Sequence, residues 1–182
     1  AIGGRENVEK LKTIHCSGNV LLVEYGVADP IDRLKLTYDS KRMSPDKHSI
    51  IVSANGDMIS KDVFDGVTGY RAQPGSRAEL VPDDVKGFKA LKSIIPQEFY
   101  GSSGYSLTYK GITTVDNQSA YTIEVIPPFG NRITEYYDSV SCLLVRQDII
   151  QNEARITFML GDYKAVNHVL FPYKISQHIG SS

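Results

Sequence analysis

The stretch Phe64-Asp65-Gly66-Val67-Thr68-Gly69-Tyr70 marks the sharpest reversal in the first half of the chain. Asp-Gly between apolar runs is a strong hairpin signal, because glycine accepts the positive φ that two-residue turns need. We therefore expect a hairpin at Asp65-Gly66. An Asp in a turn commonly binds its own backbone two residues on, so we interpret Asp65 as a turn stabiliser in preference to a catalytic carboxylate.

Strand patterns lie on both sides of this turn, and short turns such as Asn55-Gly56 join them. Residues 1–13 suggest a short helix, and about ten or eleven strands are predicted from alternation of apolar and polar residues. The predicted strands are 14–27, 33–38, 48–54, 58–64, 70–72, 105–109, 120–126, 132–137, 142–148, 154–160 and 169–175.

One longer helix is predicted over residues 84–99, after an Asp near Pro82 that suits the helix N-cap. Its apolar residues recur at spacings of three and four, and Pro96 is expected to break or kink it. The stripe is Val85, Phe88, Leu91, Ile95 and Phe99. The expected fold class is α+β, with a large, strongly curved antiparallel β half-barrel covered by one or two helices. The whole chain, 1–182, is expected to form a single domain.

The composition excludes some classes of partner. The chain has 182 residues, 41% of them hydrophobic, and its 20 basic and 21 acidic residues give a net charge of −1. Nucleic-acid binding needs a clustered basic excess, so we expect no nucleic-acid partner. The longest apolar run, Val20 to Val23, is far shorter than the roughly 20 residues of a membrane-spanning helix. The chain begins at Ala1 without a signal peptide, so we expect a mature or excised segment.

No convincing catalytic motif is present. His15, His48, His168 and His178 lack the neighbours of a zinc-peptidase motif, and there is no glycine-rich phosphate loop. We therefore expect no enzymatic activity, no cofactor and no metal site.

Three acidic residues and two cysteines leave alternatives open. Asp65, Asp138 and Asp162 are each expected at a turn, where binding to their own backbone is favoured over a carboxylate cluster. Cys16 and Cys142 are both expected within strands. Two buried free thiols are the preferred interpretation, with a disulfide as the alternative.

The order of several short motifs resembles a known family. These are Ile2-Gly3-Gly4 before a helix, the 64–70 stretch, Gly111-Ile112-Thr113-Thr114-Val115 before Ala120-Tyr121, Tyr136-Tyr137-Asp138 with Leu143-Leu144-Val145-Arg146, Asp162-Tyr163-Lys164, and Phe171-Pro172-Tyr173. Together they resemble the LolA/LolB-like superfamily of bacterial envelope proteins, which includes outer-membrane lipoprotein-sorting proteins. The resemblance covers nearly the whole chain, and its strength is the order of the motifs.

The resemblance implies a half-barrel with helices at its mouth that binds lipid or lipoprotein acyl chains without a cofactor. It also implies a location in the periplasm or at the outer membrane, and a lipid or an acylated protein as the binding partner. The expected cavity residues are Leu34, Leu36, Tyr38, Val85, Phe88, Leu91, Ile95, Phe99, Phe158, Leu160, Phe171 and Tyr173. The same apolar residues also suit an ordinary filled core, so the sequence leaves a hollow and a filled interior equally open.

A second hypothesis is an accessory C-terminal domain of a larger envelope protein, such as an insulinase-type zinc peptidase. Its role would be protein interaction with other envelope proteins or with domains of the same parent chain.

Overall fold

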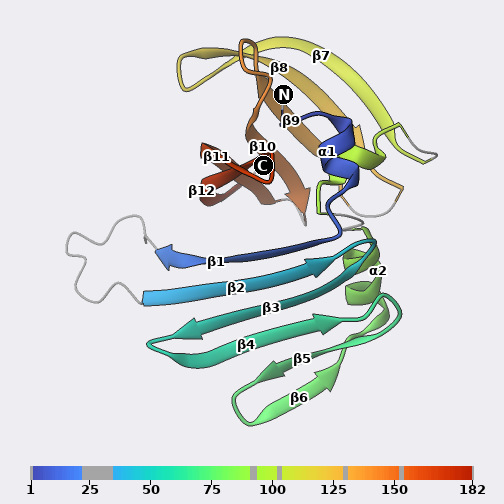
Figure 1. Ribbon diagram of the computed structural model, residues 1–182, viewed down its shortest axis with the longest axis vertical. Helices are drawn as coiled ribbons and strands as arrows, with labels where there is room; N and C mark the ends of the chain where they lie inside the picture. The colour runs from blue at the N-terminus through green and yellow to red at the C-terminus, as the bar shows by residue number, and fades with distance from the viewer. Residues whose placement is uncertain are drawn as a thin grey trace. The chain divides into compact units, whose positions relative to one another are not determined.

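The computed structural model describes residues 2–21, 35–90, 94–101, 104–128, 131–151 and 154–181. Their strands form two separate six-stranded antiparallel sheets, in the orders β1-β2-β3-β4-β5-β6 (sheet A) and β12-β11-β10-β9-β8-β7 (sheet B) (Figure 1). The chain divides into two compact units, Leu11–Ile95 with sheet A, and Ala1–Lys10 together with Pro96–Ser182 with sheet B. Each unit is described in turn.

Sheet A is a meander in which each strand pairs with its neighbour along the chain. Its strands are β1 (Thr13–Leu21), β2 (Lys35–Met43), β3 (Lys47–Ala54), β4 (Asp57–Phe64), β5 (Gly69–Gln73) and β6 (Ser76–Glu79). Asn55 and Gly56 link β3 to β4 with φ values of 52° and 95°. Two positive φ values in succession are what a type I′ hairpin requires, so this turn forms as its sequence predicts.

The turn at Asp65-Gly66 is a four-residue loop instead of the predicted two-residue one, because Phe64 pairs with Gly69. The Asp65 carboxylate accepts hydrogen bonds from the backbone N–H groups of Val67 and Thr68, at 2.8 and 2.9 Å. These bonds from Thr68 and Val67 lower the pKa of Asp65. The role of Asp65 as a turn stabiliser is confirmed.

Helix α2 (Pro82–Ala90) contacts sheet A through Phe88. The Phe88 ring centroid lies 4.2 Å from that of His48 and 5.7 Å from that of Phe64. His48 and Phe64 are cross-strand partners on β3 and β4, and Phe64 is only 1% exposed. These three rings form the centre of the core of this unit.

The predicted helix over 84–99 is wrong in its extent. α2 begins at Pro82 and ends at Ala90, and a separate 3₁₀ helix, η1, spans Pro96–Phe99. Proline suits the first position of a helix, whereas Pro96 lacks an N–H group and disfavours helical backbone at Ile95. A nine-residue helix is about 13 Å long, whereas six strands span about 24 Å. The predicted helical cover of the sheet is therefore small: among the described residues, Phe88 packs on the sheet and Asp84 lies 3.9 Å from the Arg71 guanidinium on β5.

Sheet B forms the second unit with helix α1 (Arg5–Glu9) and η1. Its strands are β7 (Ser106–Val115), β8 (Gln118–Ile126), β9 (Ile133–Asp138), β10 (Leu144–Gln151), β11 (Ala154–Val166) and β12 (Val169–Ser181). The Leu170 N–H donates to the Ile2 carbonyl at 2.8 Å. Gly3 is also required, because a Cβ there would lie 2.1 Å from the His168 carbonyl oxygen. The first residues of the chain are thus fixed against β12.

Two β-bulges interrupt the pairing of sheet B, one between Tyr109 and Gly111 and one between Leu144 and Arg146. Gly111 has a φ of 104°, which glycine adopts without strain. Bulges bend a strand and increase its twist. Figure 1 shows β7 and β8 curving along their length.

The described residues contain twelve strands instead of ten or eleven, in two sheets instead of one. β6 was not among the predicted strands, and β11 runs to Val166, so Asp162 lies inside a strand instead of at a turn. The single large sheet is wrong because α2 and η1 separate β6 from β7, and no hydrogen-bonded ladder joins the two strands.

The two cysteines also differ from the prediction. Both Cys16 and Cys142 are free, but both are exposed instead of buried. Cys142 has a φ of 57° and lies in the turn between β9 and β10, where its N–H donates to the Asp138 carbonyl at 2.8 Å.

Within the described residues, no helix is long and apolar enough to cross a membrane.

Candidate functional site

The strand register of sheet B places apolar side chains on one face. Cross-strand partners share a face of a sheet, and alternate residues along a strand return to it. The continuous pairings that define this apolar face are Leu107–Val125–Ile133–Ile149–Ile156–Ile179, Tyr109–Ile123–Glu135–Gln147–Phe158–Gln177, Ile112–Tyr121–Tyr137 and Leu160–Ile175. Two further residues of β12, Phe171 and Tyr173, continue the alternation of Ile175.

The opposite face of sheet B is polar. Glu124 on β8 lies 3.2 Å from the Lys110 ammonium group and 3.5 Å from the Arg132 guanidinium. Asp148 on β10 is 4% exposed and forms a bidentate pair with Arg146, with both N···O distances 2.8 Å.

Burial raises the pKa of Asp148, but the hydrogen bonds from Arg146 and Thr157 outweigh it, and the net pKa is lowered. Because each of these two carboxylates pairs with at least one cation, this face is interpreted as an ion-paired surface.

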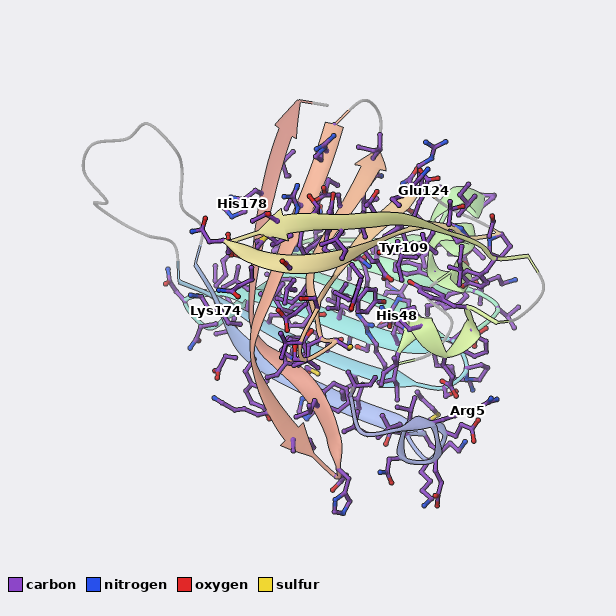
Figure 2. All side chains as sticks on the ribbon, turned by 90° about the horizontal axis from the view of Figure 1, so that it is seen from above. Arg5, His48, Tyr109, Glu124, Lys174 and His178 are labelled. Atoms are coloured by element: carbon purple, nitrogen blue, oxygen red, sulfur yellow. The ribbon has the colours of Figure 1, made fainter. Side chains whose placement is uncertain are left out.

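The apolar face is exposed at both of its edges. On the edge strand β7, Tyr109 before the bulge is 60% exposed and Ile112 after it is 63% exposed. Tyr109 is labelled in Figure 2. On the other edge strand, β12, Tyr173 is 57%, Ile175 is 59% and Ile179 is 70% exposed. Adjacent exposed apolar side chains on one face are typical of a binding surface for an apolar partner.

A fully buried carboxylate lies in the middle of this face. Glu135 on β9 is 0% exposed. Four neutral groups donate hydrogen bonds to it: Tyr100 Oη (2.6 Å), Tyr137 Oη (2.6 Å), Gln97 Nε2 (3.0 Å) and Gln147 Nε2 (3.0 Å). An ionised carboxylate accepts hydrogen bonds and donates none, so four donors suit the charged form.

The pKa values of the two tyrosines reflect this arrangement. Burial first, and then the charge and hydrogen bond of Glu135, raise the pKa of Tyr100 and of Tyr137. Since Gln97 belongs to η1 and Tyr100 follows it, Glu135 ties this segment to strands β9 and β10. Glu135 is not among the residues predicted from the sequence, although an acidic residue that alternates with Ile133 and Tyr137 on an apolar strand face is a signal of such a site.

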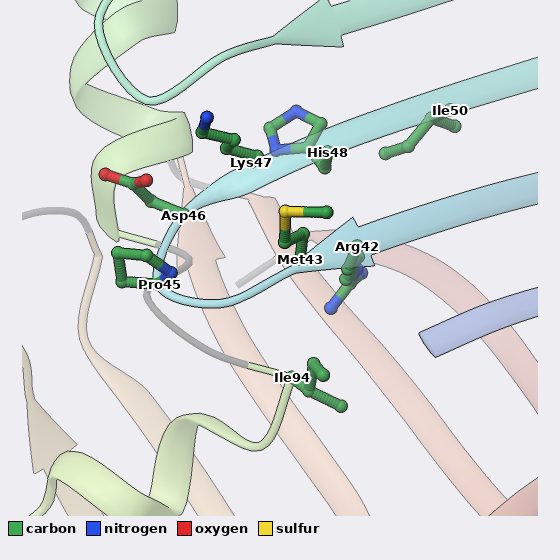
Figure 3. Close-up of a pocket in the computed structure, with 8 residues that line it drawn as sticks. All are labelled: Arg42, Met43, Pro45, Asp46, Lys47, His48, Ile50 and Ile94. Carbon is green, nitrogen blue, oxygen red and sulfur yellow. The ribbon is translucent and has the colours of Figure 1, made fainter. Parts of the chain in front are cut away.

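A small pocket lies in the other unit, at the turn between β2 and β3 (Figure 3). Its lining residues are Arg42, Met43, Pro45, Asp46, Lys47, His48, Ile50 and Ile94. Its open volume is about 10 Å³, which is room for about one water molecule and not for an acyl chain.

His48 is the buried titratable group at this pocket. It is 8% exposed, and its Nε2 atom is buried without a hydrogen-bond partner among the described residues. Burial, followed by the positive charge of Arg42, lowers the pKa of His48.

The predicted cavity residues divide between the two units. Leu36, Tyr38, Val85, Phe88 and Ile95 belong to the unit Leu11–Ile95, whereas Phe99, Phe158, Leu160, Phe171 and Tyr173 belong to the other. The structure brings Phe158, Leu160, Phe171 and Tyr173 onto the apolar face of sheet B. Leu36 and Tyr38 share a face of β2, and Leu34 and Leu91 lie outside the described residues. The assignment of all twelve to a cavity stays a prediction.

Each of the three carboxylates that were predicted at turns has local hydrogen-bond or ion-pair partners of its own. Asp65 and Asp138 each accept hydrogen bonds from the backbone of their own turns, and Asp162 pairs with Lys164 at 2.9 Å. Among the described residues, no group of three or more potential metal ligands is present.

Neither a protein-family model nor a curated protein sequence matches the chain. Solved structures do. An outer membrane lipoprotein-sorting protein domain from Vibrio parahaemolyticus matches 80% of this chain and 71% of its own, at a TM-score of 0.55 and 10% identity. A LolA superfamily protein from Nitrosomonas europaea matches 97% of this chain and 86% of its own, at a TM-score of 0.61 and 8% identity.

A DUF1329 family protein from Desulfovibrio piger matches 92% of this chain and 76% of its own, at a TM-score of 0.53 and 8% identity. Likeness at such low identity establishes the fold alone. The resemblance to LolA-like proteins is confirmed at the level of the fold, and the chain has a LolA-like fold.

Proposed function

We propose that this chain is a non-enzymatic binding and carrier module for the acyl chains of a lipid or an acylated protein. Its proposed place of work is the bacterial cell envelope, in the periplasm or at the outer membrane. The observation that carries the proposal is the apolar face of sheet B, which is exposed along β7 and β12 while the other face is polar and ion-paired.

The energetics of such a surface favour long hydrocarbon chains. Removing one methylene from water contributes about 0.8 kcal/mol of binding free energy. A chain of about twelve carbons therefore gains about 9 kcal/mol before the entropic cost of binding is subtracted. Exposed Tyr109 and Tyr173 add flat apolar area at the two edges. No charged contact is needed for binding.

The proteins of similar fold support an acylated ligand. One of them is described as a lipoprotein-sorting domain, and lipoproteins carry acyl chains. Under this proposal Phe158, Leu160, Phe171 and Tyr173 contact the ligand on sheet B. A ligand-binding role for Leu36, Tyr38, Val85, Phe88, Ile95 and Phe99 stays a prediction.

The first test is to identify what the protein carries. Purified protein is extracted with organic solvent and the extract is analysed by mass spectrometry, and binding is then followed with the neutral dye N-phenyl-1-naphthylamine. We expect co-purified acyl lipid and a dye signal that dodecanamide displaces. The absence of both would sink the proposal.

A matched pair of variants locates the site. Ile175→Asn places an amide on the apolar face and is expected to weaken dye binding at least fivefold. Lys174→Asn, one residue away on the opposite face of β12, is expected to leave it unchanged. An equal effect of the two substitutions would contradict the placement on this face.

A further inference from the structure

The buried carboxylate of Glu135 gives the apolar face an unneutralised negative charge. We infer that Glu135 sets the charge preference of the site, so that it accepts neutral acyl groups, linked as esters or amides, and excludes free fatty acids. This inference rests on the proposed function, because it names the class of acyl ligand that the same face takes.

The register places Glu135 on the same face of sheet B as the proposed ligand surface, where its carboxylate is fully buried beneath Gln97 and Tyr100. Its cross-strand partners are Ile123 on β8 and Gln147 on β10, and Ile133 and Tyr137 flank it on the same face of β9. Directly opposed residues have Cβ atoms about 4.5–5.5 Å apart. A chain lying along this face therefore passes within a side chain's length of the carboxylate.

Among the described residues, no cation pairs with this carboxylate. All four hydrogen bonds to Glu135 come from hydroxyl or amide groups, and none of the described residues forms an ion pair with it. Neutral donors stabilise a carboxylate but leave its net charge in place. Away from water, repulsion between two like charges is several times stronger than in bulk solvent.

Three other carboxylates of sheet B lie beside cations of their own. Glu124 has Lys110 and Arg132, and Asp148 has Arg146, all on the opposite face. Lys164 pairs with Asp162 at 2.9 Å and lies 4.8 Å from the centre of the Tyr173 ring, at the far end of β11. Among the described residues, Glu135 is therefore the carboxylate of the apolar face for which no cationic partner is found.

The test compares three amphiphiles with the same twelve-carbon chain and different head charges: dodecanoate, dodecanamide and dodecyltrimethylammonium. Each displaces N-phenyl-1-naphthylamine from the full chain at pH 7.5, below its micelle concentration. We expect dodecanamide to bind at least tenfold more tightly than dodecanoate, which corresponds to 1.4 kcal/mol. Dodecyltrimethylammonium should bind at least as tightly as the amide, because its charge is opposite to that of Glu135.

Glu135→Gln keeps the side-chain volume and removes the charge, so it should bring the affinities of the three amphiphiles within threefold of one another. Glu124→Gln removes the same charge from the opposite face and should leave the order unchanged. If Glu135→Gln fails to fold, the order of the three affinities measured on the natural chain decides whether the inference holds. Equal affinities of that chain for dodecanoate and dodecyltrimethylammonium overturn the inference, whereas binding of none of the three overturns the proposed function as well.

Discussion

The effect of Glu135 on the stability of the fold depends on the groups that donate hydrogen bonds to it. A buried carboxylate is stable only while its lone pairs are occupied, and removing a donor leaves the remaining charge less well compensated. Tyr100 supplies one of the two shortest of these bonds and comes from outside the sheet. The hydroxyl of Tyr100 is therefore expected to matter more for stability than its ring.

Tyr100→Phe is predicted to lower the free energy of unfolding by about 1–3 kcal/mol, because one of four hydrogen bonds to a buried charge is lost. Urea denaturation followed by circular dichroism measures the change. Tyr105→Phe is the control, since the Tyr105 ring lies 5.5 Å from that of Tyr100 and its hydroxyl does not contact Glu135. An equal loss in both variants would contradict the role given to the hydroxyl.

His48 predicts a dependence of stability on pH. In the folded state burial lowers its pKa below the ordinary value of 6.5, whereas the unfolded chain takes up a proton near that value. Acid therefore favours the unfolded state, and the stability that neutral His48 supports is present above pH 6.5 and is lost as the pH falls toward the lowered pKa.

The measurement is the free energy of unfolding at pH 7.5 and at pH 5.5. We expect the natural chain to lose stability between the two values and His48→Leu to lose markedly less. His168→Asn serves as a control, because His168 is exposed with a φ of 67°, which Asn tolerates. A loss in His48→Leu as large as in the natural chain would exclude His48 as the cause.

At the scale of the elements, the loop between β4 and β5 depends on close backbone contact. A Cβ at Gly69 would lie 2.1 Å from the Val63 carbonyl oxygen and 2.7 Å from Leu80 Cδ1. Neither neighbour has room to move, since Val63 belongs to β4 and Leu80 is buried.

Gly69→Ala is predicted to destabilise the protein by about 1–3 kcal/mol through overpacking. Thermal and urea unfolding measure it. Gly18→Ala in β1 is the matched control, because a Cβ there meets nothing within 4 Å. If Gly69→Ala proves as stable as Gly18→Ala, the close approach at Gly69 is not a constraint.

The sequence predicted the strands well and the helices poorly, for a physical reason. In a strand, apolar residues recur at every second position, and turn residues such as Asn55-Gly56 mark where the strand ends. The stripe from Val85 to Phe99 has helical spacing throughout, but the backbone restriction at Pro96 outweighs that spacing. Whether β6 and β7 would join in one sheet depends on contacts between distant residues, which periodicity does not encode.

The same limit applies to the site. Alternation predicted that Phe158 and Leu160 share a face, and the register confirms that this face continues across β8 to β12. Glu135 could not be assigned from the sequence, because its four donors come from positions 97, 100, 137 and 147, which only the fold brings together.

At the scale of the whole molecule, the charge balance of the chain predicts little electrostatic attraction for a neutral ligand. With 20 basic and 21 acidic residues, no long-range field favours binding. The affinity for dodecanamide is expected to change less than about twofold between 50 and 500 mM NaCl, since salt screens charge interactions and scarcely affects apolar contact at these concentrations. Displacement titrations at the two salt concentrations measure this, and a tenfold loss of affinity would contradict binding by apolar contact alone.

The bond between Ile2 and Leu170 has a consequence for biosynthesis. The strands of each sheet pair only with their neighbours along the chain, so the β1–β6 sheet has all its strands once residue 79 has been synthesised. Such local pairing needs no distant partner and forms early. Ile2 is different, because its hydrogen-bond donor, the Leu170 N–H, lies on β12 and is synthesised after the other eleven strands described here. Ile2 can therefore take its position only after both sheets have nearly all their strands.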